Sequence, residues 1–173
     1  GTIPPRTDFQ KFLGLLPELK IWKTIRLGLR KSSDEYRKAI EAAGYRIGDY
    51  ASQILDKITI ANTETEVDLA RMTVAELGFK KTIRYDVICS RIIDIGGQID
   101  ESGEVGPALR EQYPDQPYEW NAVAMKAIAG SDGGLGVFGV ARDRAGLWLY
   151  TYGGTPGRLF DPGAHVVFLV PRK

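Results

Sequence analysis

The sequence predicts an α+β domain in which helices pack beside an antiparallel sheet. The chain has 173 residues, 43% hydrophobic and 26% charged, which suits one folded domain with a substantial core. Its first half mixes helix-like and strand-like periodicity, whereas its second half consists of strand-like stretches separated by glycine- and proline-rich turns. We therefore expect an N-terminal tail with a short helix over residues 1–19 and a single domain over residues 20–173.

Two stretches of the first half alternate apolar and polar residues, as half-buried strands do. They cover residues 21–27 and 66–73, and in the second we expect Val67, Leu69 and Met72 to face inward. Helical spacing together with capping residues predicts four helices. These are 9–16, ended by Pro17; 35–43, opened after Ser32 and ended by Gly44; 49–55, opened by Gly48; and 82–95, capped by Thr82 and ended by Gly96-Gly97.

The second half predicts four strands, over residues 120–128, 136–141, 147–152 and 166–170. Gly133-Gly134 and Ala145-Gly146 are typical of hairpin turns, so adjacent strands are expected to pair antiparallel. A long loop rich in glycine and proline, residues 153–165, precedes the last strand. Trp148 stands between two leucines in a predicted strand, and we expect it in the core.

Composition narrows the range of partners. A net charge of +1 gives little electrostatic support for nucleic-acid binding. No apolar run reaches the length of a membrane span and the first residues lack a signal-peptide pattern, so we expect no membrane insertion by this chain. The single cysteine, Cys89, rules out an internal disulfide and a cysteine-built zinc site, and its place in the predicted helix 82–95 indicates a buried structural thiol.

Patterns of catalytic residues are weak in this sequence. His165 is the one histidine, and there is no Gly-x-Ser-x-Gly nucleophile elbow. The glycine-rich stretch 130–136 lacks a Gly-Lys-Ser/Thr ending and joins two strands, which favours a hairpin turn over a phosphate loop. A run of acidic residues lacks EF-hand spacing and is interpreted as a solvated connector, comprising Asp94, Asp100, Glu101 and Glu104. We therefore expect no enzymatic activity, no cofactor and no metal.

The segment 142–165 has the composition of a binding surface. Thr155-Pro156-Gly157-Arg158 and Asp161-Pro162-Gly163-Ala164 each predict a β-turn, and small residues there permit close approach. Aromatic residues and arginine dominate recognition hot spots. The candidate ligand-binding residues are Arg142, Asp143, Arg144, Tyr150, Tyr152, Thr155, Arg158, Leu159, Phe160, Asp161, Ala164 and His165.

The same segment carries a family resemblance. Three parts follow one another: Gly146-Leu147-Trp148-Leu149, an irregular stretch with two proline turns, and the final residues Val166 to Lys173. This layout resembles the variable proteins of diversity-generating retroelements, whose fold is similar to that of C-type lectins. In that family a template is copied with errors at adenines, so variable positions cluster before a fixed final strand. Altered AAC codons cannot encode Trp, Lys, Met, Gln or Glu, and none of these occurs between Leu149 and Arg172.

The resemblance implies a C-type-lectin-like recognition protein on a virion or cell surface, with Leu147, Trp148, Leu149 and 166–170 as scaffold. Its partner would be a protein or glycan on a host or target cell, while the oligomeric state stays open. Because the calcium motifs and disulfides of animal lectins are missing, we expect binding without calcium. Two alternatives remain: a small metal-dependent enzyme using acids of 94–104 with Arg110 or His165, and a nucleic-acid-binding or adaptor module using the basic stretch 20–30.

Overall fold

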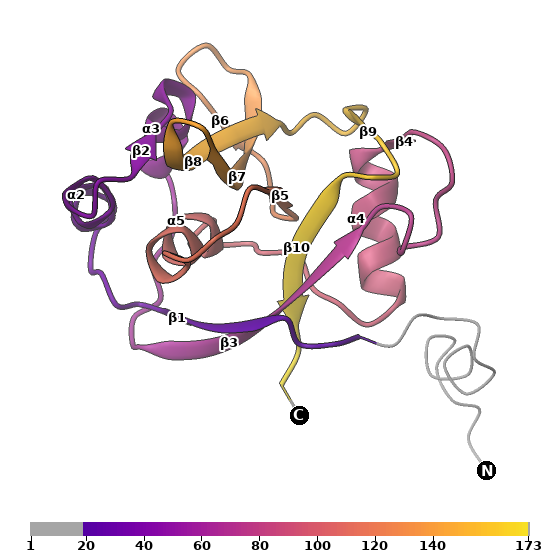
Figure 1. The fold of residues 1–173 in the computed structure, drawn as a ribbon, viewed down its shortest axis with the longest axis horizontal. Helices are drawn as coiled ribbons and strands as arrows, with labels where there is room; N and C mark the ends of the chain where they lie inside the picture. Colours follow the sequence, from indigo (N-terminus) through magenta and orange to yellow (C-terminus); the bar gives the residue numbers. More distant parts are fainter. Residues whose placement is uncertain (1–18, 173) are drawn as a thin grey trace.

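The computed structural model describes residues 19–172 and confirms the α+β class. Four helices accompany a mostly antiparallel sheet that curls into a half-barrel (Figure 1). The predicted helix 9–16 lies outside the described residues. No helix within 19–172 combines the length and the apolar character that a membrane crossing requires.

The strands of the main sheet follow one path, from β1 at one edge to β2 at the other. Its order is β1 (Lys23–Leu27), β3 (Thr65–Thr73), β10 (His165–Val170), β5 (Trp120–Val123), β7 (Leu135–Asp143), β8 (Gly146–Gly153) and β2 (Arg46–Ile47). The short strand β6 (Ile128–Ala129) pairs with β7, and β4 (Ile83–Arg84) pairs with β9 (Leu159–Phe160) in a separate small sheet. The pairs β10–β5 and β2–β8 are parallel. The last strand in sequence therefore lies inside the sheet, between β3 and β5.

The first two described helices begin and end close to where their caps predict. Helix α2 (Ser33–Ala42) is capped by Ser32, whose Oγ accepts a hydrogen bond of 3.1 Å from the Glu35 N–H. Helix α3 (Asp49–Leu55) begins after Gly48, as expected. Capping residues are local signals, which is why sequence reasoning locates these ends well.

Helix α4 (Tyr85–Asp94) begins three residues later than predicted, so Thr82 is not its cap. The chain before it is strand β4, and no side chain caps the helix. Instead, the N–H groups of Tyr85 and Asp86 donate to the carbonyls of Arg158 and Pro156 at 2.7 and 3.1 Å. Backbone from the distant loop 153–165 thus satisfies donors that every helix start leaves free.

A further helix, α5 (Val105–Gln112), was not predicted. The interpretation of the acidic residues before it as a solvated connector is wrong for Asp100 and Glu104, whereas Asp94 and Glu101 are exposed. Asp100 and Glu104 are buried because they bind main-chain donors. Asp100 accepts from the Val105 N–H at 3.0 Å, and burial raises the pKa of its carboxyl group. Glu104 accepts from the N–H groups of Gly28 (2.6 Å) and Ala61 (2.8 Å). Glu104 therefore holds two separate loops at the start of α5, and Asp100 holds the first N–H of the helix.

The hairpin predictions for the second half are confirmed. β6 and β7, and then β7 and β8, pair antiparallel, with Gly146 turning the second hairpin at a φ of 123°. The predicted strand 120–128 is broken, however, into β5 and β6.

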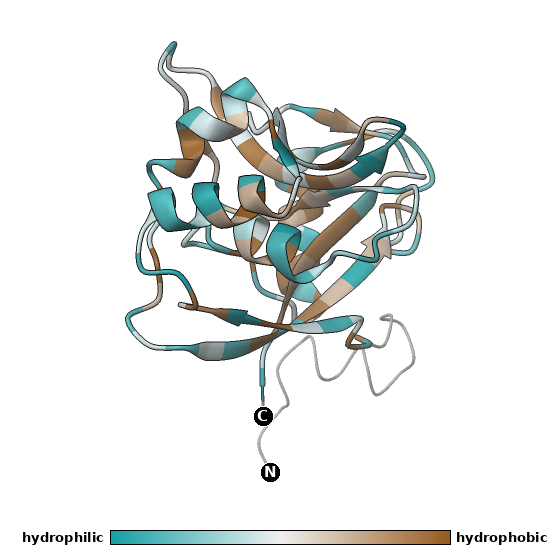
Figure 2. Cartoon of the chain, turned by 60° about the vertical axis from the view of Figure 1, so that its left-hand side comes forward, coloured by the Kyte–Doolittle hydropathy of each residue, from teal (hydrophilic) through white to brown (hydrophobic). Residues whose placement is uncertain are grey.

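The core lies between the inner faces of the sheet and the helices, where hydrophobic residues gather on the central strands (Figure 2). Helix α5 packs against β1, β7 and β8. Leu149 is fully buried, but Trp148 is half-buried and is not a core residue. Its Nε1 donates to Asp143 Oδ1 at 3.0 Å, and the Arg46 guanidinium lies 5.4 Å from its ring. A strand face open to solvent, rather than the core, holds this tryptophan.

The edge strand β1 is closed by a side chain. The Arg26 N–H donates to Gln112 Oε1, and Gln112 Nε2 donates to the Arg26 carbonyl, both at 2.8 Å. The amide of Gln112 thereby takes the place that a neighbouring strand would occupy at this position.

Candidate binding groove

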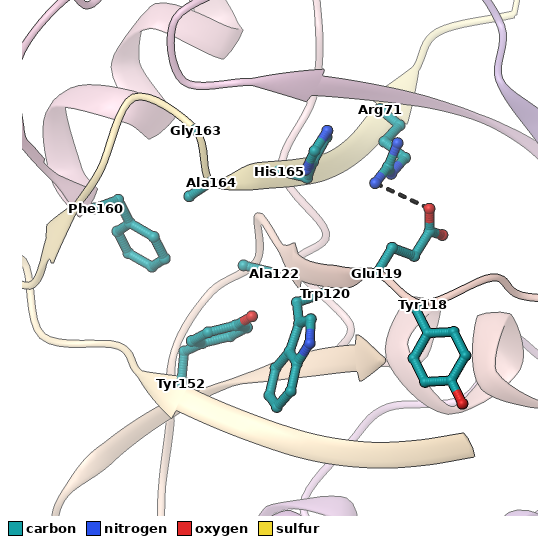
Figure 3. A pocket seen from close by; sticks show the side chains of 10 residues that line it. All are labelled: Arg71, Tyr118, Glu119, Trp120, Ala122, Tyr152, Phe160, Gly163, Ala164 and His165. Atoms are coloured by element: carbon teal, nitrogen blue, oxygen red, sulfur yellow. Dashed lines mark ion pairs between the residues drawn. The ribbon is translucent and has the colours of Figure 1, made fainter. Parts of the chain in front are cut away.

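One groove in the structure combines aromatic, small and charged side chains, and we call it the aromatic groove (Figure 3). Its volume is about 580 Å³, within the range of ordinary ligand sites. The lining residues come from β3, β5 and its preceding segment, β8, β9 and β10 with the turn before it. They are Arg71, Tyr118, Glu119, Trp120, Ala122, Tyr152, Phe160, Gly163, Ala164 and His165.

A row of four aromatic rings borders the groove, and three of them, Trp120, Tyr152 and Phe160, line it. Ring centroids are 5.3 Å apart for Trp120 and Tyr150, 5.1 Å for Tyr150 and Tyr152, and 5.9 Å for Tyr152 and Phe160. The two tyrosines lie across β7 at Gly139, where an added Cβ would stand 2.8 Å from the Tyr150 ring and 2.9 Å from the Tyr152 ring. The absence of a side chain at Gly139 therefore allows the row to form.

The polar end of the groove is an ion pair, and most polar atoms of its two side chains already have a partner. Arg71 Nη2 lies 3.0 Å from Glu119 Oε2, and Arg71 Nε donates to Asn121 Oδ1 at 2.6 Å. The other Glu119 oxygen accepts from Tyr113 Oη at 2.7 Å and from Asn121 Nδ2 at 3.1 Å. This network holds both charged side chains in fixed positions at the rim.

His165 lies half-buried at the start of β10, facing the groove (Figure 3). Burial lowers the pKa of its imidazole below the ordinary value of 6.5, and the positive charge of Arg71 lowers it further. The ring is therefore neutral at pH 7, with one nitrogen that donates and one that accepts.

Arg110 supports the groove from the interior. It is fully buried in α5, donating from Nη1 to Gln116 Oε1 (2.6 Å) and to the Ala141 carbonyl (3.1 Å), and from Nη2 to the Tyr113 carbonyl (2.7 Å). Burial lowers its pKa to about 10, so it stays charged at pH 7. These bonds tie the segment 113–119, which carries two groove residues, to strand β7.

The loop 153–165 is held by its backbone. The N–H groups of Val74 and Ala75 donate to the carbonyls of Ala164 and Pro162, both at 2.9 Å, in addition to the bonds that it makes to the start of α4. Residues of β9 within the loop also pair with β4. By contrast, several of its side chains are exposed, namely those of Thr155, Arg158, Leu159 and Asp161. Main-chain contacts therefore set the shape of the loop.

Four of the predicted site residues line the groove: Tyr152, Phe160, Ala164 and His165. Tyr150 lies beside them in the aromatic row. Phe160 does not project outward as expected, because it is 6% exposed and packs against the rings of Tyr85 and Tyr152. It forms part of the groove floor and part of the core.

The remaining predicted residues lie at two separate ends of the hairpin β7–β8. At one end, the turn is surrounded by Arg142, Asp143 and Arg144. The opposite end of the paired stretch lies about 23 Å away, since a strand rises about 3.3 Å per residue. The exposed loop residues of 153–165 lie at that opposite end. Arg142 reaches the groove, since its guanidinium lies 5.0 Å from the Tyr118 ring, whereas Asp143 accepts from the Ala145 N–H at 2.8 Å within the turn.

Sequence reasoning missed the half of the groove that lies outside 142–165. Trp120 is 52% exposed and Tyr118 67% exposed, while Arg71 and Glu119 form the ion pair at the rim. Two exposed aromatic residues around an acid, directly after Pro114 and Pro117, were the available signal. Their closeness to Tyr152 depends on strand order, which local patterns do not contain.

Metal ligands and a reactive thiol are absent from the described residues. Within residues 19–172, no group of three or more His, Cys, Asp or Glu side chains is placed to hold a metal ion. Burial raises the pKa of the Cys89 thiol, which keeps it protonated at pH 7. Comparisons of the chain with protein-family models, curated proteins and solved structures find no match.

Proposed function

We propose that this chain is a recognition protein of C-type-lectin-like architecture that binds a protein or glycan through the aromatic groove and the exposed side chains of the loop beside it. In this proposal it is a variable protein of a diversity-generating retroelement, and copies of the gene differ in the segment 142–165. Its action is surface binding without calcium and without bond chemistry.

One observation carries the proposal: main-chain bonds hold the loop 153–165, while its side chains at Thr155, Arg158, Leu159 and Asp161 face solvent. A backbone carbonyl can accept its hydrogen bond whatever side chain its residue bears. Such a loop therefore tolerates many sequences on one backbone, which is the requirement for a diversified binding surface.

The order of elements supports the architectural part of the proposal. Strand β1 comes early, helices α2 and α3, strand β3 and helices α4 and α5 follow, and a strand-rich second half then precedes a long loop and a last strand. That last strand, β10, is paired on both sides and largely buried, which suits a scaffold beneath variable side chains.

The test is to sequence the region around the gene and its copies in related strains. We expect a reverse-transcriptase gene and a near-copy repeat of the segment encoding 142–170, differing at template adenines. Differences between copies should gather at exposed positions such as Arg158 and Asp161 and should spare the buried Phe160. Copies that differ evenly along the chain, with no repeat nearby, would refute the proposal.

A further inference from the structure

We infer that the aromatic groove binds an acidic segment of a protein ligand, which inserts one apolar side chain between Trp120 and Phe160 and places carboxylates beside Arg142 and Arg158. The inference rests on the proposed function, since it names the chemistry of the ligand at the same site.

The middle of the groove is apolar. Ala122 and Ala164 are small, and the buried Phe160 closes the floor between them and Tyr152 (Figure 3). Trp120, which is 52% exposed, lines the same groove beside Tyr152 (Figure 3). A concave apolar floor beside an exposed tryptophan matches the pockets in which an apolar anchor residue of a protein partner is buried.

Two arginines outside the lining of the groove lie beside aromatic residues that line it. The Arg142 guanidinium lies 5.0 Å from the Tyr118 ring at one end, and that of Arg158 lies 5.8 Å from the Phe160 ring at the other. Neither forms an ion pair with a carboxylate among residues 19–172. The nearby Asp161 carboxylate accepts instead from Thr82 Oγ1 at 3.2 Å. Two cations without acidic partners are complementary to carboxylates on either side of an apolar anchor.

The occupied polar atoms favour a peptide over a sugar. Sugar hydroxyls need free donors and acceptors, but both oxygens of Glu119 already have partners, and two of the nitrogens of Arg71 do as well. Strand β5, which carries Trp120 and Ala122, is paired with β7 and β10, so a peptide cannot bind as an added strand at this point. Recognition must therefore proceed through side chains of the ligand.

The experiment is selection of a random peptide library, with peptides of about 12 residues displayed on phage, against the intact chain. We expect enriched peptides to contain one aromatic residue, Leu or Met with Asp or Glu on both sides. Selection against Trp120→Ala should not enrich them, whereas the matched variant Ile93→Ala, at an exposed apolar position on α4, should behave as wild type.

A labelled peptide of the enriched sequence then gives the affinities by fluorescence anisotropy. Trp120→Ala should weaken binding about 10-fold or more, as loss of a hot-spot residue does. Arg158→Glu should weaken it about 5-fold at low salt and less at about 0.5 M NaCl, where charges are screened. The charge-matched control Lys38→Glu, at an exposed position on α2 outside the segment 142–165, should change it by less than about 2-fold.

Enriched peptides that are neutral or basic, or that bind Trp120→Ala as well as wild type, would overturn the inference. Binding to a glycan array that disappears in Trp120→Ala would also overturn it, but would leave the groove as a recognition site. A different observation would refute the proposed function, namely gene copies that do not differ in the loop 153–165.

Discussion

At the scale of single residues, the groove depends on two residues that do not line it. Gly139 leaves room for two tyrosines to lie across β7, and Arg110 holds the segment bearing Tyr118 from beneath. Neither is exposed. The groove can therefore lose its shape through changes in residues that do not line it.

Replacing Gly139 by alanine should open the aromatic row. The new Cβ would stand under 3 Å from both tyrosine rings, which must swing outward because β7 behind them is paired. We expect a loss of about 1–3 kcal/mol in the free energy of unfolding, as for other overpacked sites, and changed chemical shifts for the Trp120 indole N–H. Gly157→Ala, with no atom within 4 Å of the added Cβ, is the matched control. Unchanged Trp120 shifts in Gly139→Ala would contradict this account.

His165 should make stability depend on pH on the acid side of neutrality. Burial lowers the pKa of the folded imidazole below 6.5, so the unfolded chain takes up the proton first. The free energy of unfolding should then fall as the pH drops through about 6.5. Above that value the imidazole is neutral in both states, and the stability that it contributes is fully present. Urea unfolding of wild type and His165→Gln from about pH 5 to 8 measures it. Equal pH dependence in the two proteins would exclude His165 as the cause.

At the scale of elements, the loop 153–165 and helix α4 complete each other. The helix has no side-chain cap, and the loop supplies the carbonyls that its first N–H groups need. The loop in turn gains fixed anchor points through its backbone, and within residues 19–172, among its four exposed side chains named above, only that of Asp161 makes a hydrogen bond to another element, to Thr82. In this part of the chain, the backbone therefore keeps its shape largely independently of which exposed side chains it carries, and we call this the separation of shape and sequence.

This separation predicts that the exposed loop side chains can be changed together. Substituting Thr155, Arg158, Leu159 and Asp161 with serine should shift the Tm by less than about 4 °C, because exposed side chains contribute little to stability. Phe160→Ala, between two of these positions, should instead cost about 3–5 kcal/mol through the cavity it leaves. Thermal unfolding followed by circular dichroism distinguishes the two. A large loss of stability in the fourfold variant would show that side chains hold the loop.

The elements that sequence predicted correctly are those with local signals. Ser32 caps α2, and Gly146 turns the β7–β8 hairpin, as their residue types indicate. Helix α5 was missed because Asp100 and Glu104 were interpreted as solvent-facing acids. In the structure Asp100 binds the N–H of Val105 at the start of the helix, and Glu104 binds main-chain groups far away in sequence. Only half of the groove was predicted. The other half, Arg71 and residues 118–122, lies near the loop because of the order of strands in the sheet, which local sequence patterns do not contain.

At the scale of the whole molecule, β10 joins two parts of the chain. On one side it pairs antiparallel with β3 from the first half, and on the other it pairs parallel with β5 from the second half. Val166, Val167 and Phe168 are nearly fully buried within it. The half-barrel is therefore continuous only when this strand is in place.

Amide hydrogen exchange should report this arrangement. We expect the slowest exchange in β10 and in its partner β3, at a free energy near that of global unfolding, because both are paired on two sides. The two-residue strands β6 and β9 should exchange much faster. Nuclear magnetic resonance or mass spectrometry gives the order. Fast exchange at Val167 would show that the two sides of the sheet open independently.

The position of β10 also bears on synthesis. A ribosome makes β3 and β5 well before the strand that must lie between them, so a nascent chain stopped within 153–165 leaves both with open edges. A chain that ends within this segment should be degraded readily, which limited proteolysis of a chain ending at Asp161 can check. If the segment is diversified as we propose, folding would remove those copies in which translation stops before β10 is made.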